Sequence, residues 1–227
     1  MSPQSRETAM NTTTAPRSAQ ALPAGTPAAA RTALRLLQRL QHGHLTVQLP
    51  DGTLQHFGHG NGPSAAITFK NWNVCSAALR SGDIGFAESY IAGDWTTPHL
   101  TDLLKLFIAN RQQVEGVIYD GLFKRYISST DFIQQYIFPG GCLPCPREFR
   151  RQAQAAGLRV VDELAFGLDY AETLRRWHER FVAQRTHILQ QGFDQRFLHI
   201  WEFYLAYCEA AFTMGNINLV QYTLERE

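Results

Sequence analysis

The chain has 227 residues, of which 44% are apolar and 18% are charged, and its formal net charge is +1. A charge so close to balance provides no general attraction to nucleic acid, so we expect no nucleic-acid partner, and any attraction to anionic lipid must come from a local patch. No apolar run approaches the roughly 20 residues that a membrane-spanning helix requires, and four cysteines do not make a disulfide framework, so we expect a cytoplasmic protein, soluble or peripheral on the inner membrane face.

The N-terminal segment, residues 1–32, is predicted to be a disordered tail. It is rich in Ala, Thr, Pro and Ser and lacks the apolar stretch of a secretion signal. Because the segment is basic and poor in acidic residues, a transit peptide is the alternative. We favour a disordered tail, since little apolar surface is available to offset the entropy lost on ordering.

Residues 33–112 are predicted to form a small domain of mixed helix and sheet. Residues 31–42 carry Leu34, Leu37 and Leu40 at helical spacing, with arginines on the other faces, which indicates a short basic amphipathic helix. This helix either packs on the core of its own domain or contacts a phospholipid surface. Three strands are expected, the first two joined by an Asp-Gly hairpin, at residues 45–49, 54–58 and 65–69.

Helical patterns follow the predicted sheet. They cover residues 73–79, 86–91 and 100–110, and Gly82 and Gly85 interrupt the pattern between the first two. In the second half, residues 113–227, two strands are predicted beside several helices. The expected strands are residues 158–164 and 218–224, and the expected helices are residues 146–156, 170–190 and 196–214.

Two segments of the chain resemble the cyclopropane-fatty-acyl-phospholipid synthases, a family that includes the mycolic acid cyclopropane synthase-like methyltransferases. Residues 85–95 read Gly-Phe-Ala-Glu-Ser-Tyr-Ile-Ala-Gly-Asp-Trp, and residues 131–141 read Asp-Phe-Ile-Gln-Gln-Tyr-Ile-Phe-Pro-Gly-Gly. The resemblance continues through Phe-Gly-Leu-Asp-Tyr at residues 166–170 and through residues 201–212. It implies a small N-terminal domain followed by part of a class I methyltransferase domain.

In that family a whole S-adenosylmethionine-binding domain separates the two segments. Here fewer than about 40 residues lie between Trp95 and Phe132, whereas such a domain needs about 100 to 150. The glycine-rich residues 58–62 have no strand-turn-helix pattern around them that would bind the cofactor. We therefore predict an α+β fold: the N-terminal domain plus the C-terminal helices and antiparallel strand pair of a methyltransferase fold whose central parallel sheet is absent through an internal deletion.

The resemblance implies a reaction in lipid biosynthesis. Family members transfer the methyl carbon of S-adenosylmethionine to a cis double bond of a phospholipid acyl chain, and a bound bicarbonate ion removes the proton. By resemblance, Tyr170 occupies the position of the family tyrosine that hydrogen-bonds the bicarbonate. A phenol stays protonated at neutral pH and can donate to an anion. Taken alone, Tyr170 would be interpreted as a core or helix-capping tyrosine.

Three functions follow from these observations. In the first, the chain is a cyclopropane synthase-like protein that binds neither S-adenosylmethionine nor bicarbonate by itself. It is then inactive alone, or it works with a cofactor domain from another chain. The alternative is a non-catalytic module that binds a phospholipid membrane surface or forms a homodimer. The third is an internally deleted gene product without a function.

Other reactive side chains are interpreted as structural. Cys142 and Cys145 form one Cys-x-x-Cys pair without a second ligand pair, so neither metal binding nor redox chemistry is favoured. Glu88 is interpreted as a buried hydrogen-bonding group rather than an acid catalyst. Solvated histidines are expected at His42, His44, His56 and His59, and core aromatic residues, rather than an acyl channel, at Trp201, Tyr204 and Phe212.

Overall fold

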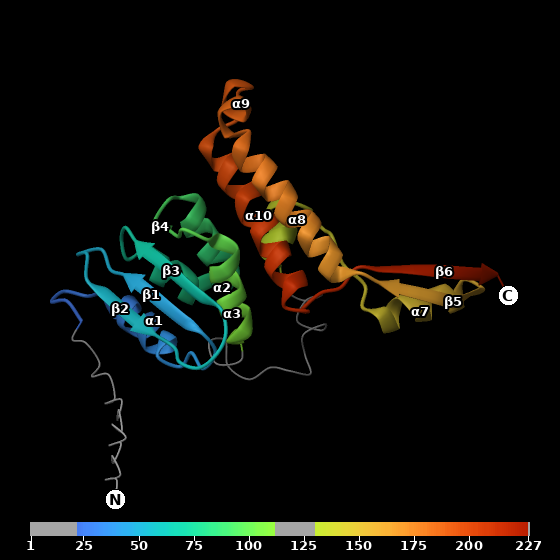
Figure 1. The fold of residues 1–227 in the computed structure, drawn as a ribbon, viewed down its shortest axis with the longest axis horizontal. Coiled ribbons are helices and arrows are strands. Elements are labelled where there is room, and N and C mark those ends of the chain that lie inside the picture. Colours follow the sequence, from blue (N-terminus) through green and yellow to red (C-terminus); the bar gives the residue numbers. More distant parts are fainter. Residues whose placement is uncertain (1–21, 112–129, 227) are drawn as a thin grey trace, which may run out of the picture.

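The computed structural model describes residues 22–111 and 130–226. They form a mixed fold of helices and two small sheets. In Figure 1 the N-terminal sheet and its helices lie on one side, two long helices stand beside them, and a two-stranded ribbon projects away on the other side. Most of the predicted tail and the predicted boundary between residues 112 and 113 lie outside the described residues.

The N-terminal sheet has the order β2-β1-β3-β4. Strand β1 pairs antiparallel with β2 and parallel with β3. The predicted Asp-Gly hairpin is confirmed, because Leu49 N donates to Thr53 O at 2.8 Å and Gly52 has φ +87°, a region that favours glycine. Strand β4 was not predicted, because two residues are too short to show an alternating pattern. The bounds are β1 His44–Gln48, β2 Leu54–Phe57, β3 Ser64–Phe69 and β4 Trp95–Thr96.

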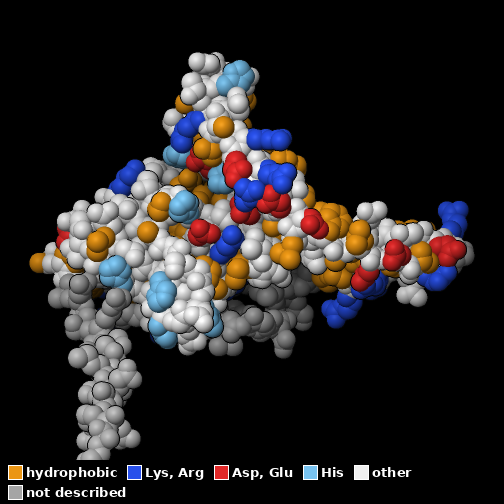
Figure 2. Space-filling model, in the orientation of Figure 1, with side chains coloured by type: hydrophobic (Ala, Val, Ile, Leu, Met, Phe, Trp, Pro, Cys, Tyr) orange, Lys and Arg blue, Asp and Glu red, His pale blue; other side chains and the backbone are white. Residues whose placement is uncertain are grey.

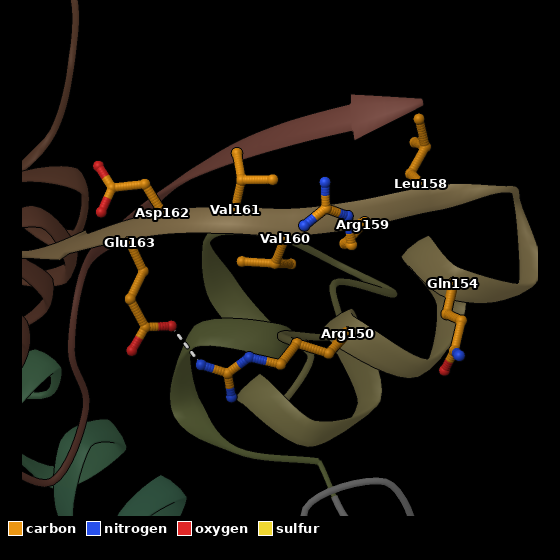
Figure 3. Close-up of a pocket in the computed structure, with 8 residues that line it drawn as sticks. All are labelled: Arg150, Gln154, Leu158, Arg159, Val160, Val161, Asp162 and Glu163. Carbon is orange, nitrogen blue, oxygen red and sulfur yellow. Dashed lines mark hydrogen bonds and ion pairs between the residues drawn. The ribbon is translucent and has the colours of Figure 1, made fainter. Parts of the chain in front are cut away.

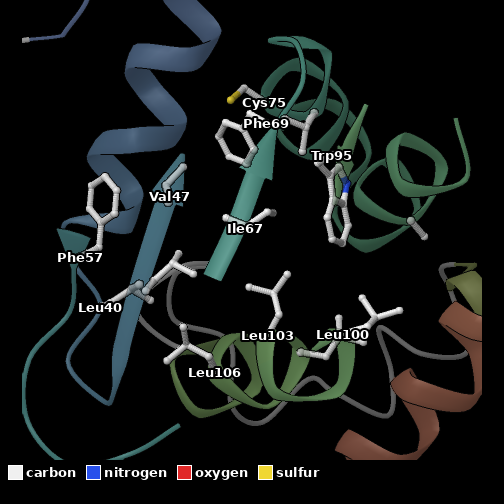
Figure 4. Close-up of a cluster of buried hydrophobic side chains, with 14 of the residues drawn as sticks. Leu40, Val47, Phe57, Ile67, Phe69, Cys75, Trp95, Leu100, Leu103 and Leu106 are labelled. Atoms are coloured by element: carbon white, nitrogen blue, oxygen red, sulfur yellow. The ribbon is translucent and has the colours of Figure 1, made fainter. Parts of the chain in front are cut away.

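Three helices join this sheet in one hydrophobic core. They are α1 Ala28–Leu37, α2 Asn73–Ile91 and α3 Leu100–Ala109. Figure 4 shows leucines of α3 directed toward Ile67 of β3, with Trp95 beside them. Helix α1 begins before the predicted start at Arg31, so ordered structure extends into the predicted tail. Its Leu34 is buried in this core, so the prediction that the apolar side of the helix packs on its own domain is confirmed, and the predicted lipid contact can involve only the exposed side.

Helix α2 bends where the sequence predicts an interruption. Ser81 and Gly82 leave helical geometry, and Gly82 has φ +56°. The prediction of a second break at Gly85 is wrong. Gly85 is buried within the helix, and a Cβ there would lie 2.0 Å from the carbonyl oxygen of Ala77. The close approach of the two parts of α2 therefore requires glycine at this position.

The C-terminal half contains helices and one antiparallel strand pair, as predicted. Strand β5 pairs with β6 in a register that places Leu158 opposite Arg226. The predicted helix over residues 170–190 is instead two helices, because Gln184 has φ −93° and ψ 8° and ends the first of them. The elements are α6 Phe132–Tyr136, α7 Pro146–Ala155, β5 Leu158–Ala165, α8 Gly167–Ala183, α9 Arg185–Gln190, α10 Gln195–Thr213 and β6 Val220–Arg226.

Helix α10 joins the two halves. Phe203, Ala206 and Ala210 belong to the core of the N-terminal half, which also receives Phe132 of α6. On another side of α10, Leu205, Cys208 and Phe212 pack with Ala171 and Leu174 of α8. A helix that is buried on more than one side has apolar residues around most of its circumference. None of the described helices is both long and apolar enough to span a bilayer.

The described residues contain a four-stranded and a two-stranded sheet. The only parallel pairing in them is between β1 and β3, in the N-terminal domain. The expected mixed α and β content is therefore confirmed. The absence of a central parallel methyltransferase sheet from the protein stays a prediction.

The packing of α3 predicts a large loss of stability on truncation of one leucine. Leu103 is 0% exposed, whereas Leu79 of α2 is 42% exposed. We expect Leu103→Ala to lower the free energy of unfolding by about 2 to 5 kcal/mol and Leu79→Ala to lower it by about 0.5 kcal/mol or less. Denaturant unfolding followed by tryptophan fluorescence measures both. Equal losses for the two variants would contradict this description of the core.

Candidate functional site

The first turn of α8 is held by a side chain from the segment between α10 and β6. Gly167 N donates to Asn218 Oδ1 at 2.9 Å, and Leu219 N donates to the same oxygen at 2.9 Å. A Cβ at position 167 would lie 2.5 Å from that oxygen, so the contact requires glycine. Since Phe166 provides no side-chain cap, Asn218 satisfies a backbone donor that the helix leaves free at its start.

Tyr170 lies one turn into α8 and is half-buried. Its ring meets the ring of Phe212 edge-on at a centroid distance of 5.1 Å and that of Trp177 at 6.0 Å. The tyrosine packs against the small cluster between α8 and α10. The ring therefore packs against this cluster without being fully buried in it, and the bicarbonate-binding role of its hydroxyl stays a prediction.

Tyr204 and Cys208 of α10 provide further polar atoms close to Tyr170. The Tyr204 hydroxyl lies close enough to the Cys208 thiol for each group to affect the pKa of the other. Burial raises the pKa of Tyr204 to about 12, with a further contribution from Cys208 and Tyr170, and burial also raises the pKa of Cys208 to about 12. At neutral pH the phenol is therefore a hydrogen-bond donor, and the protonated thiol is a poor nucleophile.

Two surface hollows lie in the C-terminal half. One, of about 650 Å³, is beside the start of α8 and is lined by residues 165–169 and parts of 212–218, but not by Tyr170. The other, of about 600 Å³, lies between α7 and β5. Figure 3 shows Arg150 paired there with Glu163, while Arg159 and Asp162 add charges of both signs. This balance favours no single class of charged ligand.

The two segments identified by resemblance contact each other. Tyr136 of α6 donates its hydroxyl proton to Glu88 Oε1 of α2 at 2.5 Å. The prediction of a buried Glu88 is wrong, because the residue lies on the exposed side of α2, but its hydrogen-bonding role is confirmed. Burial and the neighbouring Glu88 raise the pKa of Tyr136 to about 12, so this phenol stays protonated at neutral pH.

A second contact between the halves includes a buried carboxylate. The Tyr90 hydroxyl of α2 donates to Glu202 Oε2 at 3.1 Å, and Arg185 Nη1 lies 3.3 Å from Glu202 Oε1. Burial, followed by the charge of Glu202, raises the pKa of Tyr90. Glu202 is buried on α10, and a buried carboxylate requires such partners to offset the loss of hydration.

Glu209 is a second buried carboxylate on α10. The Thr101 hydroxyl donates to Glu209 Oε2 at 3.1 Å, and Lys105 Nζ lies 4.0 Å from Glu209 Oε1. Burial raises the pKa of Glu209, while Thr101 and Lys105 act in the opposite direction. Sequence analysis missed both Glu202 and Glu209. Their spacing of two helical turns within an aromatic and apolar helix is the signal that they share a buried side.

The remaining groups singled out in the sequence are the possible metal ligands, the cysteine pair, the glycine-rich segment and the aromatic residues of α10. In the described ranges no three His, Cys, Asp or Glu side chains are placed to hold a metal ion, and Cys142 and Cys145 are free thiols. The glycine-rich segment joins β2 to β3, and a Cβ at Gly58 would lie 2.4 Å from Gly43 O. Close packing of two loops therefore accounts for that glycine. The core prediction is confirmed for Phe212, whereas Trp201 and Tyr204 are half-buried.

Comparison with known proteins gives one family and several similar enzymes. The model of the mycolic acid cyclopropane synthetase family matches residues 108–222. Tuberculostearic acid methyltransferase of Mycobacterium tuberculosis is 47% identical over 97 residues, which cover 42% of this chain and 23% of that protein. Cyclopropane-fatty-acyl-phospholipid synthase of Escherichia coli is 34% identical over 106 residues, or 47% of this chain and 27% of that protein.

A probable fatty acid methyltransferase of Pseudomonas putida is 41% identical over 91 residues, which cover 40% of this chain and 23% of that protein. The chain thus spans about a quarter of the length of the curated relatives it matches. The residues that the family model matches include Tyr170, Glu202 and Glu209.

The surroundings of Glu209 predict a specific dependence of stability on pH. Because the pKa of Glu209 is higher in the folded protein than in the unfolded chain, its contribution favours folding at low pH and is lost as the pH rises through the folded-state pKa. Glu209→Gln stays uncharged and can still accept from Thr101. We therefore expect the stability of this variant, relative to the unmodified protein, to increase between about pH 4 and pH 8.

Denaturant unfolding at several pH values measures this difference. The matched control is Glu179→Gln, since Glu179 is an exposed carboxylate on α8. A stability difference for Glu209→Gln that stays constant over the pH range, or that decreases, would contradict the assignment of a buried, desolvated carboxylate at this position.

Proposed function

The chain belongs to the mycolic acid cyclopropane synthetase family, and we propose that it takes part in the S-adenosylmethionine-dependent modification of lipid acyl chains. In this proposal the chain contributes the segment containing Tyr170, and another polypeptide supplies the cofactor-binding domain. The observation that supports it is that the residues matched by the family model include α8 and α10, which pack against each other. Alone, the chain is expected to be inactive.

The described residues do not fit S-adenosylmethionine. Its binding in this type of enzyme depends on a strand, a glycine turn and a helix, but the glycines at residues 58–62 join two strands and pack against the loop at Gly43. No step through this cofactor is therefore assigned to residues of this chain. Bicarbonate is a better fit, because its negative charge accepts hydrogen bonds from protonated phenols.

In the proposed reaction an alkene attacks the methyl carbon, and a proton must then leave the cationic product. Bicarbonate would accept that proton when bound. The role of Tyr170 would be to donate its hydroxyl hydrogen to the anion and to hold it in place, with its ring fixed by Phe212. Asn218 positions Tyr170 indirectly, since it holds the start of α8.

The first test is titration of the purified chain with S-adenosylmethionine by calorimetry. We expect no saturable binding up to about 1 mM, a range in which an ordinary cofactor site would be occupied. One-to-one binding would contradict the proposal that the cofactor domain comes from another polypeptide.

The second test is complementation. The chain is expressed with a cyclopropane synthase truncated before its own matching tyrosine, in a bacterium that lacks cyclopropane lipids. We expect the unmodified chain and Tyr222→Phe to restore ring-bearing acyl chains, and Tyr170→Phe to lower their yield by about 100-fold, the size of one lost acid-base contribution. Gas chromatography of the fatty acids measures the yield. Equal yields from the two tyrosine variants would contradict the role of Tyr170.

The alternative function, binding to a phospholipid surface, is supported by the exposed side of α1. Arg31 and Arg35 of α1 and Arg39, in the turn that follows the helix, are all exposed, while Leu34 is buried on the other side of α1. Four-residue spacing places Arg31 and Arg35 along one stripe of the helix, and Arg39 follows it in the chain. Such a local patch can attract anionic headgroups although the net charge of the chain is only +1.

Reversal of this stripe predicts weaker vesicle binding. Each arginine near an anionic surface contributes about 1 kcal/mol, so Arg35→Glu with Arg39→Glu should lower partitioning by about 30-fold or more. Co-sedimentation with phosphatidylglycerol vesicles at low salt measures it. The control variant reverses two exposed arginines elsewhere, Arg147 and Arg180. No sedimentation of the unmodified chain, or an equal loss in the control, would contradict a lipid-binding role for α1.

A further inference from the structure

The loop between β2 and β3 contains the sequence Gly-Asn-Gly at residues 60–62. Asn61 and Gly62 are both exposed. Figure 2 shows histidine side chains on the surface of the N-terminal half, to which this loop belongs. Asparagine is a thermolabile residue, and Asn61 is the asparagine of this chain that precedes a glycine. Because glycine has no Cβ, its backbone nitrogen is open to the approach of the preceding side chain.

The two groups that would react are not held in place by hydrogen bonds. Within residues 22–111 and 130–226, the Asn61 side chain and Gly62 N make no hydrogen bond, and both groups are open to water. Gly60 and Gly62 have φ values of +81° and +148°, and glycine adopts other backbone conformations at little cost. The segment can therefore rotate until the Gly62 nitrogen meets the carbonyl carbon of the Asn61 side chain.

The Asp51–Gly52 step in the β1–β2 hairpin is a natural comparison, because the same ring closure is chemically possible there. Its backbone nitrogen is engaged, since Gly52 N donates to Leu49 O at 2.9 Å. The Asp51 carboxylate is held as well: Oδ1 accepts from Thr53 N and Oδ2 from Thr53 Oγ1, both at 3.0 Å. Hydrogen bonds must break before this step can react, whereas the step at Asn61 has no such restraint.

We propose that Asn61–Gly62 is a site of spontaneous covalent modification, at which Asn61 becomes an aspartyl or isoaspartyl residue. Gly62 N loses its proton to water or to an exposed imidazole and attacks Cγ of Asn61. The N–Cγ bond forms, the Cγ–Nδ2 bond breaks, and the leaving nitrogen takes up a proton and departs as ammonia. Water then adds to one of the two carbonyl carbons of the cyclic imide and breaks its bond to nitrogen, which leaves a carboxylate.

The modification changes both the charge and the packing of the loop. The new carboxylate lowers the formal net charge of +1 by one unit. In the isoaspartyl form the backbone passes through Cβ and gains a carbon atom before Gly62. The loop has little room for this, because a Cβ at Gly62 would already lie 2.8 Å from Gly43 N. The isoaspartyl form therefore packs less well against the segment before β1. This inference does not depend on the proposed lipid chemistry.

Peptide mapping tests the proposal, because trypsin releases both steps in one peptide, residues 40–70. The purified chain is incubated at mildly alkaline pH with and without guanidinium chloride, and electron-transfer fragmentation locates each isoaspartyl residue. We expect folding to slow the reaction at Asn61 by less than about three-fold, and that at Asp51 by about ten-fold or more, since hydrogen bonds protect only the hairpin. The comparison with the unfolded chain cancels the different intrinsic reactivities of the two steps.

The matched variant is Asn61→Gln, whose longer side chain would have to close a larger ring. We expect it to form no product at residue 61 and to leave the slow reaction at Asp51 unchanged. The isoaspartyl form, separated by anion exchange, should unfold at a lower denaturant concentration than the unmodified chain. An unreactive Asn61 in the folded chain, equal slowing of the two steps on folding, undiminished product in Asn61→Gln, or equal unfolding midpoints would each overturn the proposal.

Discussion

The burial of α10 on more than one side is the constraint on which the rest of the structure depends. One side takes Phe203 and Ala206 into the core of the N-terminal half, and another takes Leu205 and Phe212 into the contact with α8. Polar groups are tolerated on such a helix only where partners replace water. The two buried carboxylates on α10 have such partners in α2, α3 and the start of α9. Packing and polar contacts therefore fix the same arrangement of the two halves.

That arrangement also determines what Tyr170 can do. Asn218 holds the start of α8, Gly167 permits the close contact, and Phe212 of α10 supports the tyrosine ring. The adjacent Tyr204 is protonated at neutral pH because burial raises its pKa. A protonated phenol can donate a hydrogen bond to an anion, and this is the role that the proposed function gives to Tyr170. The chemistry of the family also needs a methyl donor, and the described residues do not fit one.

The stability of the β5–β6 ribbon has a different physical basis. It lies outside both hydrophobic clusters, and α7 packs against one face of it through Phe149 and Arg150. Its stability therefore depends on local pairing and on whatever covers the edge of β6. The core between α8 and α10 and the projecting ribbon are joined only by short connections at Phe166 and Leu219.

The sequence by itself determined the family, through the resemblance of long segments, and the elements whose signals are local: the Asp-Gly hairpin, the bend at Gly82, most helix positions and the individual strands β5 and β6. Such features depend on neighbours within a few residues, and their periodicity is visible without a fold. Only the tertiary structure decided the exposure of Glu88, the partners of Glu202 and the cap that Asn218 provides. These contacts join residues 48, 112 and 51 positions apart, and no local pattern specifies which distant side chain a polar group will meet.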